Sequence, residues 1–255
     1  MTRLPRTCSA TGFRLLPATG GEGYKVGKTI YNPLTALTRS PDQHRDEWSR
    51  YDVVLRQTVY LAETRECAYA EVLASFKRPA GSDDPLAKDA EALGMSVEEF
   101  IEEIAAEWAE RDFMGLGSVP AGWRHDRGMY VIELPSDGWW IDIEHPDSIA
   151  ALEVHGGSTM RMHDVTALTT AHLRGDNRSL TTTLAEYAYR APLDDGTYPR
   201  GIHFGSKHGA YWCKAVLMEE GNNRPGDLLA LSPEPILVTD SDLERVASRY
   251  RIRVF

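Results

Sequence analysis

The chain has 255 residues, of which 42% are hydrophobic and 26% are charged, a composition typical of a globular protein with a buried core. No apolar run approaches the roughly 20 residues of a membrane-spanning helix, and no apolar segment follows the basic residues at the N-terminus, so we expect a cytoplasmic protein without a membrane partner. The formal net charge of −10 argues against direct nucleic-acid binding, which needs clustered Lys and Arg, but leaves a small anionic substrate open.

The first half of the chain alternates loops with short regular elements. Residues 1–45 are rich in Gly, Pro and Thr and predict loops and short strands. The β-branched and aromatic run at 57–62 predicts a buried strand, and the apolar spacing at 66–76 predicts a helix after it. A further helical segment is expected at 86–93, and the Ser96–Glu99 spacing predicts a capping box at the start of the next helix.

The second half predicts strands followed by capped helices and further strands. Strands are expected at 129–134, 139–143, 201–204, 211–218, 228–231, 236–238 and 251–255. Helices are expected from an Asp147 cap through Leu152, from an Asp164 cap to about Leu173, from a Ser179 or Thr181 cap to about Tyr189, and after an Asp240 cap.

Short strands mixed with helices, without a regular strand–helix–strand rhythm, predict an α+β fold. We expect one domain over residues 1–255, with a helical insertion or lid at 80–125. Within that segment Ile101, Ile104 and Trp108 share one helix face, which either packs internally or forms a homodimer contact.

Common catalytic and metal-binding signatures are absent from the sequence. The three cysteines are far apart and form no Cys-x-x-Cys pair, so neither a disulfide framework nor a zinc site is indicated. Asp142, Glu144 and His145 lie close in sequence and form either a cation-binding cluster or ordinary surface polarity. We expect no bound metal and no resident cofactor.

The most informative segment runs from an arginine through a strand into a helix. Arg50 precedes the strand that carries Tyr60, and Glu71 lies two helical turns after Thr64. A carboxylate on the inner side of that helix can face the strand end. The alternative is that Arg50 and Glu71 are surface residues that form salt bridges.

The order of several short motifs resembles the RES domain, a toxin family named for its Arg, Glu and Ser residues. The motifs are Arg50-Tyr51-Asp52, Val59-Tyr60-Leu61-Ala62, Ala68-Tyr69-Ala70-Glu71 and Gly201-Ile202-His203-Phe204-Gly205-Ser206. The resemblance covers about 24–218. It departs from the family at Tyr24-Lys25-Val26, where family members have Tyr-Arg-Val.

The resemblance implies an ADP-ribosyltransferase-like fold of mixed, mostly antiparallel sheets, with NAD⁺ as substrate. It implies Arg50, Tyr60 and Glu71 as catalytic residues. Arg50 would bind the pyrophosphate, Tyr60 would stack on nicotinamide, and Glu71 would stabilise positive charge on the ribose. Ser206, Lys207 and His208 would complete the nucleotide-binding site with Arg50 and Tyr60.

Cleavage of the nicotinamide–ribose bond leaves the acceptor open. Water gives a glycohydrolase, inorganic phosphate a phosphorylase, and a protein side chain an ADP-ribosyltransferase. Family members commonly pair with a separately encoded helix-turn-helix antitoxin of the Xre type, so the resemblance implies a toxin of such a pair. A non-catalytic NAD-binding or regulatory module is the alternative.

Overall fold

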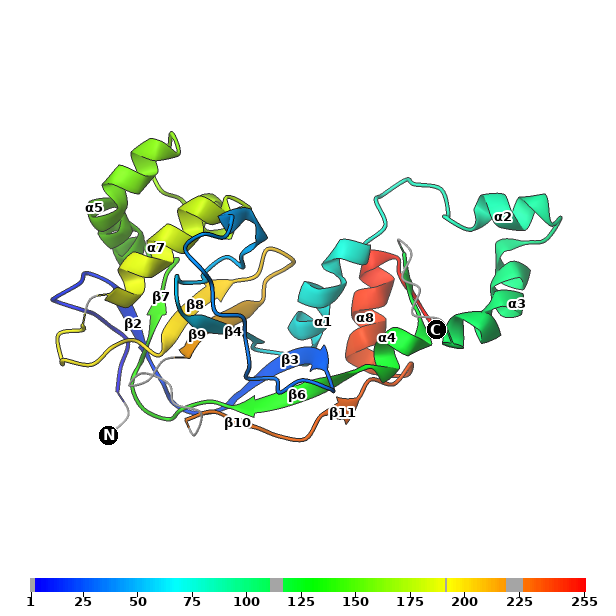
Figure 1. Cartoon of the computed structure of the whole chain (residues 1–255), viewed down its shortest axis with the longest axis horizontal. Helices are drawn as coiled ribbons and strands as arrows, with labels where there is room; N and C mark the ends of the chain where they lie inside the picture. The colour runs from blue at the N-terminus through cyan, green and yellow to red at the C-terminus, as the bar shows by residue number, and fades with distance from the viewer. Residues whose placement is uncertain (1–2, 111–116, 191, 219–226) are drawn as a thin grey trace. The chain divides into compact units, whose positions relative to one another are not determined.

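The computed structural model describes residues 3–110, 117–190, 192–218 and 227–255, with the side chains of 106–110 excepted (Figure 1). The chain forms two compact units, each built from three segments. The first unit comprises 1–25, 32–64 and 131–231, and the second comprises 26–31, 65–130 and 232–255. The single domain and the lid at 80–125 stay predictions. No helix among the described residues has the length and apolarity needed to cross a membrane.

A mixed, mostly antiparallel sheet forms the framework of the first unit. In the described residues its strands follow the order β1-β2-β7-β8-β9-β4-β3-β6-β10. The strands are β1 (Arg6–Thr7), β2 (Arg14–Pro17), β3 (Glu22–Lys28), β4 (Gln57–Ala62), β6 (Arg127–Glu133), β7 (Trp139–Asp142), β8 (Gly201–Gly205), β9 (Trp212–Met218) and β10 (Leu229–Ala230). In the described residues β7 and β8 pair in parallel, whereas the pairs β1–β2, β2–β7, β8–β9, β9–β4, β4–β3 and β6–β10 are antiparallel. The predicted α+β class is confirmed.

Strand β4 lies between β9 and β3 in the interior of this sheet, and Thr58, Val59, Leu61 and Ala62 are buried. β4 pairs with β9 from Gln57↔Met218 to Ala62↔Cys213. Val59 and Leu61 point to one face and Tyr60 to the other, because side chains alternate along a strand. Val59 and Leu61 are both buried. The strands predicted at 57–62, 201–204 and 211–218 are therefore confirmed.

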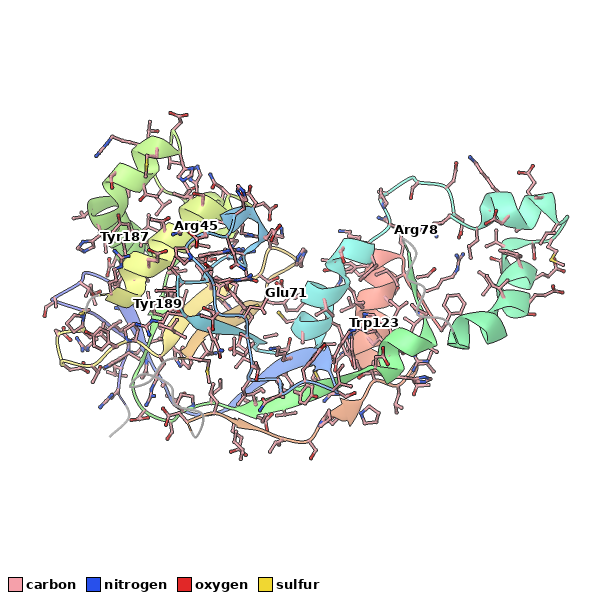
Figure 2. The ribbon with its side chains drawn as sticks, in the orientation of Figure 1. Arg45, Glu71, Arg78, Trp123, Tyr187 and Tyr189 are labelled. Carbon is pink, nitrogen blue, oxygen red and sulfur yellow. The ribbon has the colours of Figure 1, made fainter. Side chains whose placement is uncertain are left out.

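The helices of the first unit are α5 (Pro146–Met162), α6 (Thr170–Arg174) and α7 (Arg178–Arg190), with a short 3₁₀ turn η1 (Arg45–Glu47). The Tyr189 hydroxyl donates to the Ala215 carbonyl at 3.0 Å, which ties α7 to β9. Arg45 of η1 also contacts α7, where it donates to Thr182 and pairs with Glu186 at 2.7 Å (Figure 2). Helix α7 thereby fixes the loop that leads to Arg50.

Two sequence predictions for α5 are wrong in detail. α5 continues to Met162 instead of ending at Leu152, because Gly156 packs closely on Leu184, where a Cβ would lie 2.6 Å from a methyl carbon. Its N-cap is His145 rather than Asp147. Tertiary packing here outweighs the low helix propensity of two glycines.

The caps of the next two helices also differ from the predictions. Thr169, not Asp164, caps α6 in a capping box with His172. Helix α7 begins at Arg178, and the side chain of Asn177 accepts from the Leu180 N–H at 3.0 Å, so neither Ser179 nor Thr181 is the cap. Each true cap lies near the predicted one, and its selection depends on where the preceding loop ends.

The second unit is mainly helical. Its elements are α1 (Arg65–Leu73), η2 (Ala74–Phe76), α2 (Ala87–Ala92), α3 (Val97–Glu110), β5 (Ser118–Val119), α4 (Ala121–His125), β11 (Glu234–Pro235), α8 (Ser241–Tyr250) and β12 (Arg253–Val254). β12 pairs in parallel with β5, and β11 pairs with the Gly128–Met129 end of β6. The strand predicted at 236–238 is therefore wrong by two residues.

Ion pairs and a hydroxyl bond join α1 to α8. Glu66 pairs with Arg249 at 2.8 Å and with Arg245 at 3.1 Å, and the Tyr69 hydroxyl donates to Asp240 at 2.8 Å. Asp240 also accepts from the first N–H groups of α8, as predicted for its N-cap.

The capping box at the start of α3 is confirmed, because the Ser96 and Glu99 side chains each accept from the other residue's N–H. Ile101 and Ile104 on this helix are both half-buried. The side chain of Trp108 lies outside the described residues, so the choice between internal packing and a dimer contact stays open.

Candidate functional site

The segment before β4 is held to that strand by the side chain of Asp52. One carboxylate oxygen accepts from the Tyr60 hydroxyl at 2.9 Å, and the other accepts from Arg39 at 2.6 Å. The Tyr60 hydroxyl in turn accepts from the Tyr51 N–H at 2.8 Å. Burial and the charge of Asp52 raise the pKa of Tyr60 well above its usual value, so this phenol stays protonated. These bonds fix the position of the Arg50-Tyr51 backbone.

Arg50 is a buried cation with few partners. Its side chain is 7% exposed, and its terminal nitrogen donates one long bond of 3.4 Å to the Gly205 carbonyl. Its guanidinium carbon lies 5.5 Å from the centroid of the Phe204 ring. Its Nε is buried without a hydrogen-bond acceptor. No carboxylate in the described part of the chain forms an ion pair with it.

Aromatic rings pack beside Arg50. The rings of Tyr51 and Phe204 meet edge to face at 4.8 Å between centroids, and Tyr60 approaches Phe204 at 6.3 Å. The Tyr51 hydroxyl donates to the Leu173 carbonyl at 3.0 Å. Burial raises the pKa of Tyr51, and the nearby charge of Arg50 partly opposes that shift. The rings nearest the Arg50 guanidinium are therefore those of Phe204 and Tyr51, whereas the Tyr60 ring lies against Phe204 and its hydroxyl donates to Asp52.

The loop after β8 carries the other predicted binding residues. Ser206 is buried, and its hydroxyl accepts from the His208 N–H at 2.9 Å. The Ser206 N–H donates to the Tyr211 carbonyl at 2.9 Å. Lys207 is exposed and forms an ion pair with Asp176 at 2.6 Å, while His208 is half-buried. The Ser206 hydroxyl thus shapes the loop that begins beside Arg50.

An ion pair that sequence reasoning missed supports the end of β8. Arg174 pairs with both oxygens of Glu144, at 2.9 and 2.6 Å, and Glu144 also accepts from the Gly205 N–H at 2.9 Å. A Cβ on Gly205 would lie 2.1 Å from a guanidinium nitrogen of Arg174, so a larger residue there would force this guanidinium to move. Glu144 is therefore a buried partner of Arg174, and in this arrangement it is neither a metal ligand nor a solvent-exposed residue. The available signal in the sequence was a glycine directly after the strand predicted at 201–204.

The neighbouring positions of β7, β8 and β9 carry Asp142, His203 and Lys214 in one row. His203 stacks on Trp212 at 4.6 Å between centroids, and its Nδ1 is buried without a partner. Burial and the charge of Lys214 lower the pKa of His203 to about 4, so its ring is neutral at physiological pH. Burial also raises the pKa of Asp142 and lowers the pKa of Lys214.

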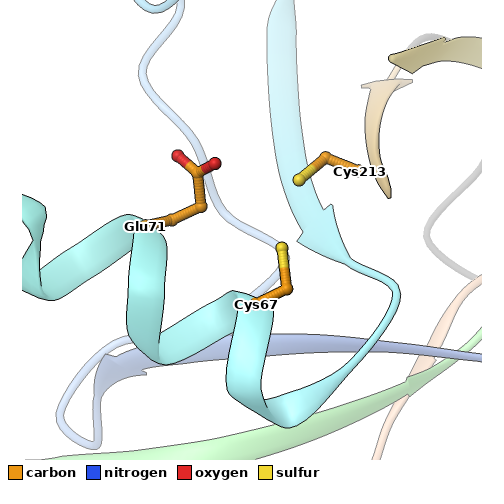
Figure 3. A group of neighbouring side chains, drawn as sticks. All are labelled: Cys67, Glu71 and Cys213. Atoms are coloured by element: carbon orange, nitrogen blue, oxygen red, sulfur yellow. The ribbon is translucent and has the colours of Figure 1, made fainter. Parts of the chain in front are cut away.

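Glu71 belongs to the second unit, where it is an exposed residue of α1. Cys67 lies one helical turn before it and is buried (Figure 3). Cys213, the third residue drawn there, is a buried residue of β9 in the first unit. Within the first unit, the structure brings Arg50 and Tyr60 together with the loop that carries Ser206, Lys207 and His208.

Comparisons with known proteins give a distant structural likeness. No family model matches the chain, and no curated protein is similar to it. Among solved structures, the chain is similar to the crystal structure of the M. tuberculosis MbcT–MbcA toxin–antitoxin complex, with 14% sequence identity and a TM-score of 0.47 over 92% of this chain and 91% of that chain. A likeness of this size carries no argument about activity, so the function proposed below rests on the chain's own residues.

Proposed function

We propose that the protein binds NAD⁺ at the Arg50–Tyr60 site and cleaves its nicotinamide–ribose bond. The observation that carries the proposal is the buried guanidinium of Arg50. A buried charge without a counter-charge is costly, and such groups are normally paired. The long bond to Gly205 and the unpartnered Nε leave this cation short of acceptors. An anionic ligand supplies them, and a planar guanidinium suits a phosphate oxygen pair.

Aromatic surfaces beside the cation support a nucleotide rather than a simple anion. The ring of Phe204 lies next to Arg50, and the ring of Tyr60 lies against Phe204. Tyr60 stays protonated near neutral pH, because burial and the charge of Asp52 raise its pKa. The nicotinamide ring of NAD⁺ is cationic, so a neutral tyrosine ring can hold it by stacking and cation–π attraction.

Glu71 is the proposed electrostatic stabiliser of the reaction. Cleavage breaks the bond between the ribose carbon and the nicotinamide nitrogen, and the bonding electron pair leaves with nicotinamide. Positive charge then develops on the ribose, and an ionised carboxylate stabilises that state, as in glycosidases. Water as acceptor gives ADP-ribose and a proton, whereas inorganic phosphate gives a phosphorylated ADP-ribose. The motif order described for the sequence supports assigning Glu71 to this role.

The decisive experiment measures nicotinamide release from NAD⁺ by the purified full-length protein, with and without inorganic phosphate. We expect release by the wild type and a strong loss in Arg50→Ala and Glu71→Gln. Arg200→Ala and Glu91→Gln are matched controls, an arginine paired with aspartate and an exposed helical glutamate of the second unit. Unchanged release in folded Arg50→Ala and Glu71→Gln would overturn the mechanism. NAD⁺ binding without release identifies a non-catalytic module instead.

We further propose that the protein is the toxin of a toxin–antitoxin pair in which a separately encoded protein blocks the site. The sequence resemblance supports this proposal. Expression of the protein alone in bacteria should lower cellular NAD⁺ and stop growth, and Arg50→Ala should abolish both effects. Normal growth with unchanged NAD⁺, at an expression level that gives folded protein, would remove the toxin assignment. ADP-ribose attached to protein in place of free product would identify a transferase.

A further inference from the structure

An exposed carboxylate near Arg50 is held by two other cations. One oxygen of Asp176 accepts from Lys207 at 2.6 Å and from Arg178 at 3.1 Å. Asp176 is 73% exposed, whereas Arg178 is 18% exposed. Arg178 is fixed in turn by a 3.0 Å bond to the Gly175 carbonyl. Arg178 and Lys207 therefore converge on one anion, the exposed carboxylate of Asp176.

The third cation of this cluster is Arg50 itself. The pKa of Asp176 is lowered first by the Lys207 hydrogen bond and then by the charges of Lys207, Arg178 and Arg50. Arg50 and Lys207 are attached to the same strand end, since Arg50 donates to Gly205 and Lys207 follows two positions later. Arg174 does not join the set because Glu144 already neutralises it.

The charges in this cluster do not balance. Arg50, Arg178 and Lys207 are positive, and Asp176 is the single carboxylate that these three share in the described residues. A diphosphate carries a negative charge on each phosphate, so it matches the cluster better than one carboxylate does. A surface ion pair such as Lys207–Asp176 contributes little to stability and is easily exchanged for another anion.

We propose that Arg50, Arg178 and Lys207 form the diphosphate-binding set of the site, and that Asp176 occupies the position of one phosphate until the ligand displaces it. The inference rests on the proposed function, because it names how that site recognises its substrate. No bond is made or broken in this exchange. Asp176 is then a built-in competitor that weakens binding of phosphate-bearing ligands, and Arg178 is a binding residue that no sequence motif indicated.

The test uses ADP and AMP as probes in calorimetric titrations of the full-length protein. Asp176→Asn should tighten ADP binding by about tenfold, since it removes one competing charge, and should tighten AMP binding less. Arg178→Ala should weaken ADP binding by about tenfold. Asp137→Asn and Arg200→Ala are matched controls, because Asp137 is 77% exposed, Arg200 is 16% exposed, and the two form an ion pair at 2.9 Å. Both controls should bind ADP like the wild type.

Each outcome separates this inference from the proposed function. Unchanged or weaker ADP binding in Asp176→Asn overturns the competitor role, even if Arg50→Ala abolishes nicotinamide release and the proposed function stands. Equal losses in Arg178→Ala and Arg200→Ala overturn the binding role of Arg178. Tighter ADP binding in Asp176→Asn supports the phosphate-binding set, even if the wild type releases no nicotinamide and the proposed function fails.

Discussion

Arg50 in the first unit and Arg124 in the second are both almost completely buried, at 7% and 9% exposure, yet their surroundings differ. Arg124 donates to the main-chain oxygen of Phe255 at 2.7 Å and to the Ile236 carbonyl at 3.0 Å. Arg50 has one long bond of 3.4 Å and a buried Nε without an acceptor. The bonds of Arg124 join three segments of the chain, whereas Arg50 retains an N–H donor without an acceptor.

The contrast separates a structural arginine, Arg124, from Arg50, the arginine that we propose binds a ligand. A buried donor without a partner costs free energy, so a native protein retains one where it serves a purpose. Burial alone does not distinguish the two arginines, because both are buried to nearly the same degree. We expect that the number of satisfied hydrogen bonds distinguishes a structural group from a ligand-binding one, and substitutions at four positions test this expectation.

The largest effect is expected at Arg50. In Arg50→Met, nicotinamide release should fall by about 100-fold or more, because the substrate loses its main charge partner. The thermal midpoint should stay the same or rise, since the substitution removes an unpaired buried cation. Calorimetry and the release assay on the same preparation check both statements. A lower midpoint would show that Arg50 stabilises the fold, as Arg124 does.

Arg124→Met should have the opposite result. Two buried main-chain oxygens lose their donors, and the free energy of unfolding should fall by about 2–3 kcal/mol. Urea unfolding measures this loss, and nicotinamide release per folded molecule should stay within about twofold of the wild type. If Arg124→Met were as stable as the wild type, satisfied hydrogen bonds would not distinguish the two arginines.

His203 extends the comparison to a second unpartnered group. Its pKa in the folded protein is about 4, below the ordinary value of 6.5, so the unfolded chain binds more protons between these values. Its contribution to stability is complete above pH 6.5 and is lost as pH falls towards 4, with about 2 kcal/mol lost between pH 7 and pH 5. His203→Phe keeps a ring against Trp212 and should reduce this loss. Urea unfolding at the two pH values measures it, and an equal loss in the variant would assign the effect to other groups.

The smallest effect is expected at Tyr60, whose hydroxyl is satisfied within the same site as Arg50. Tyr60→Phe leaves Asp52 and the Tyr51 N–H without one partner each and should cost about 1 kcal/mol of unfolding free energy. Because the ring is retained, nicotinamide release should change by less than about threefold. A 100-fold loss of release without a change in stability would instead place the hydroxyl in the chemistry.

The elements that could be predicted from the sequence are those whose formation depends on their own residues and immediate neighbours. The apolar runs of β4, β8 and β9 show where strands pass through the core, and Asp240 and Ser96 cap helices through bonds to their immediate neighbours. The length of α5 could not be predicted, because a glycine normally weakens a helix. Gly156 is tolerated within α5 because it packs against Leu184, which lies on a different helix. Local signals cannot show such a contact.

The candidate site divides in the same way. Arg50, Tyr60 and the Ser206 loop were found because short motifs carry them. Arg174, Asp176 and Arg178 could not be predicted as site residues, and Glu144 was considered only as a ligand for a cation, because their roles depend on which charges the loops bring together. Ion pairing between distant segments has no spacing rule, so it becomes visible only when the chain is folded.

The packing of α1 on α8 has a consequence for the order in which the protein assembles during synthesis. Glu66 of α1 and Arg245 of α8 are 179 positions apart, and Arg249 follows four positions later. The ribosome must therefore release the residues through Tyr250 before the helix that carries Glu71 can dock on α8. Domains generally fold as units during synthesis, so the second unit is completed last. Glu71, the carboxylate proposed for the chemistry, therefore reaches its folded position only after α8 has been synthesised.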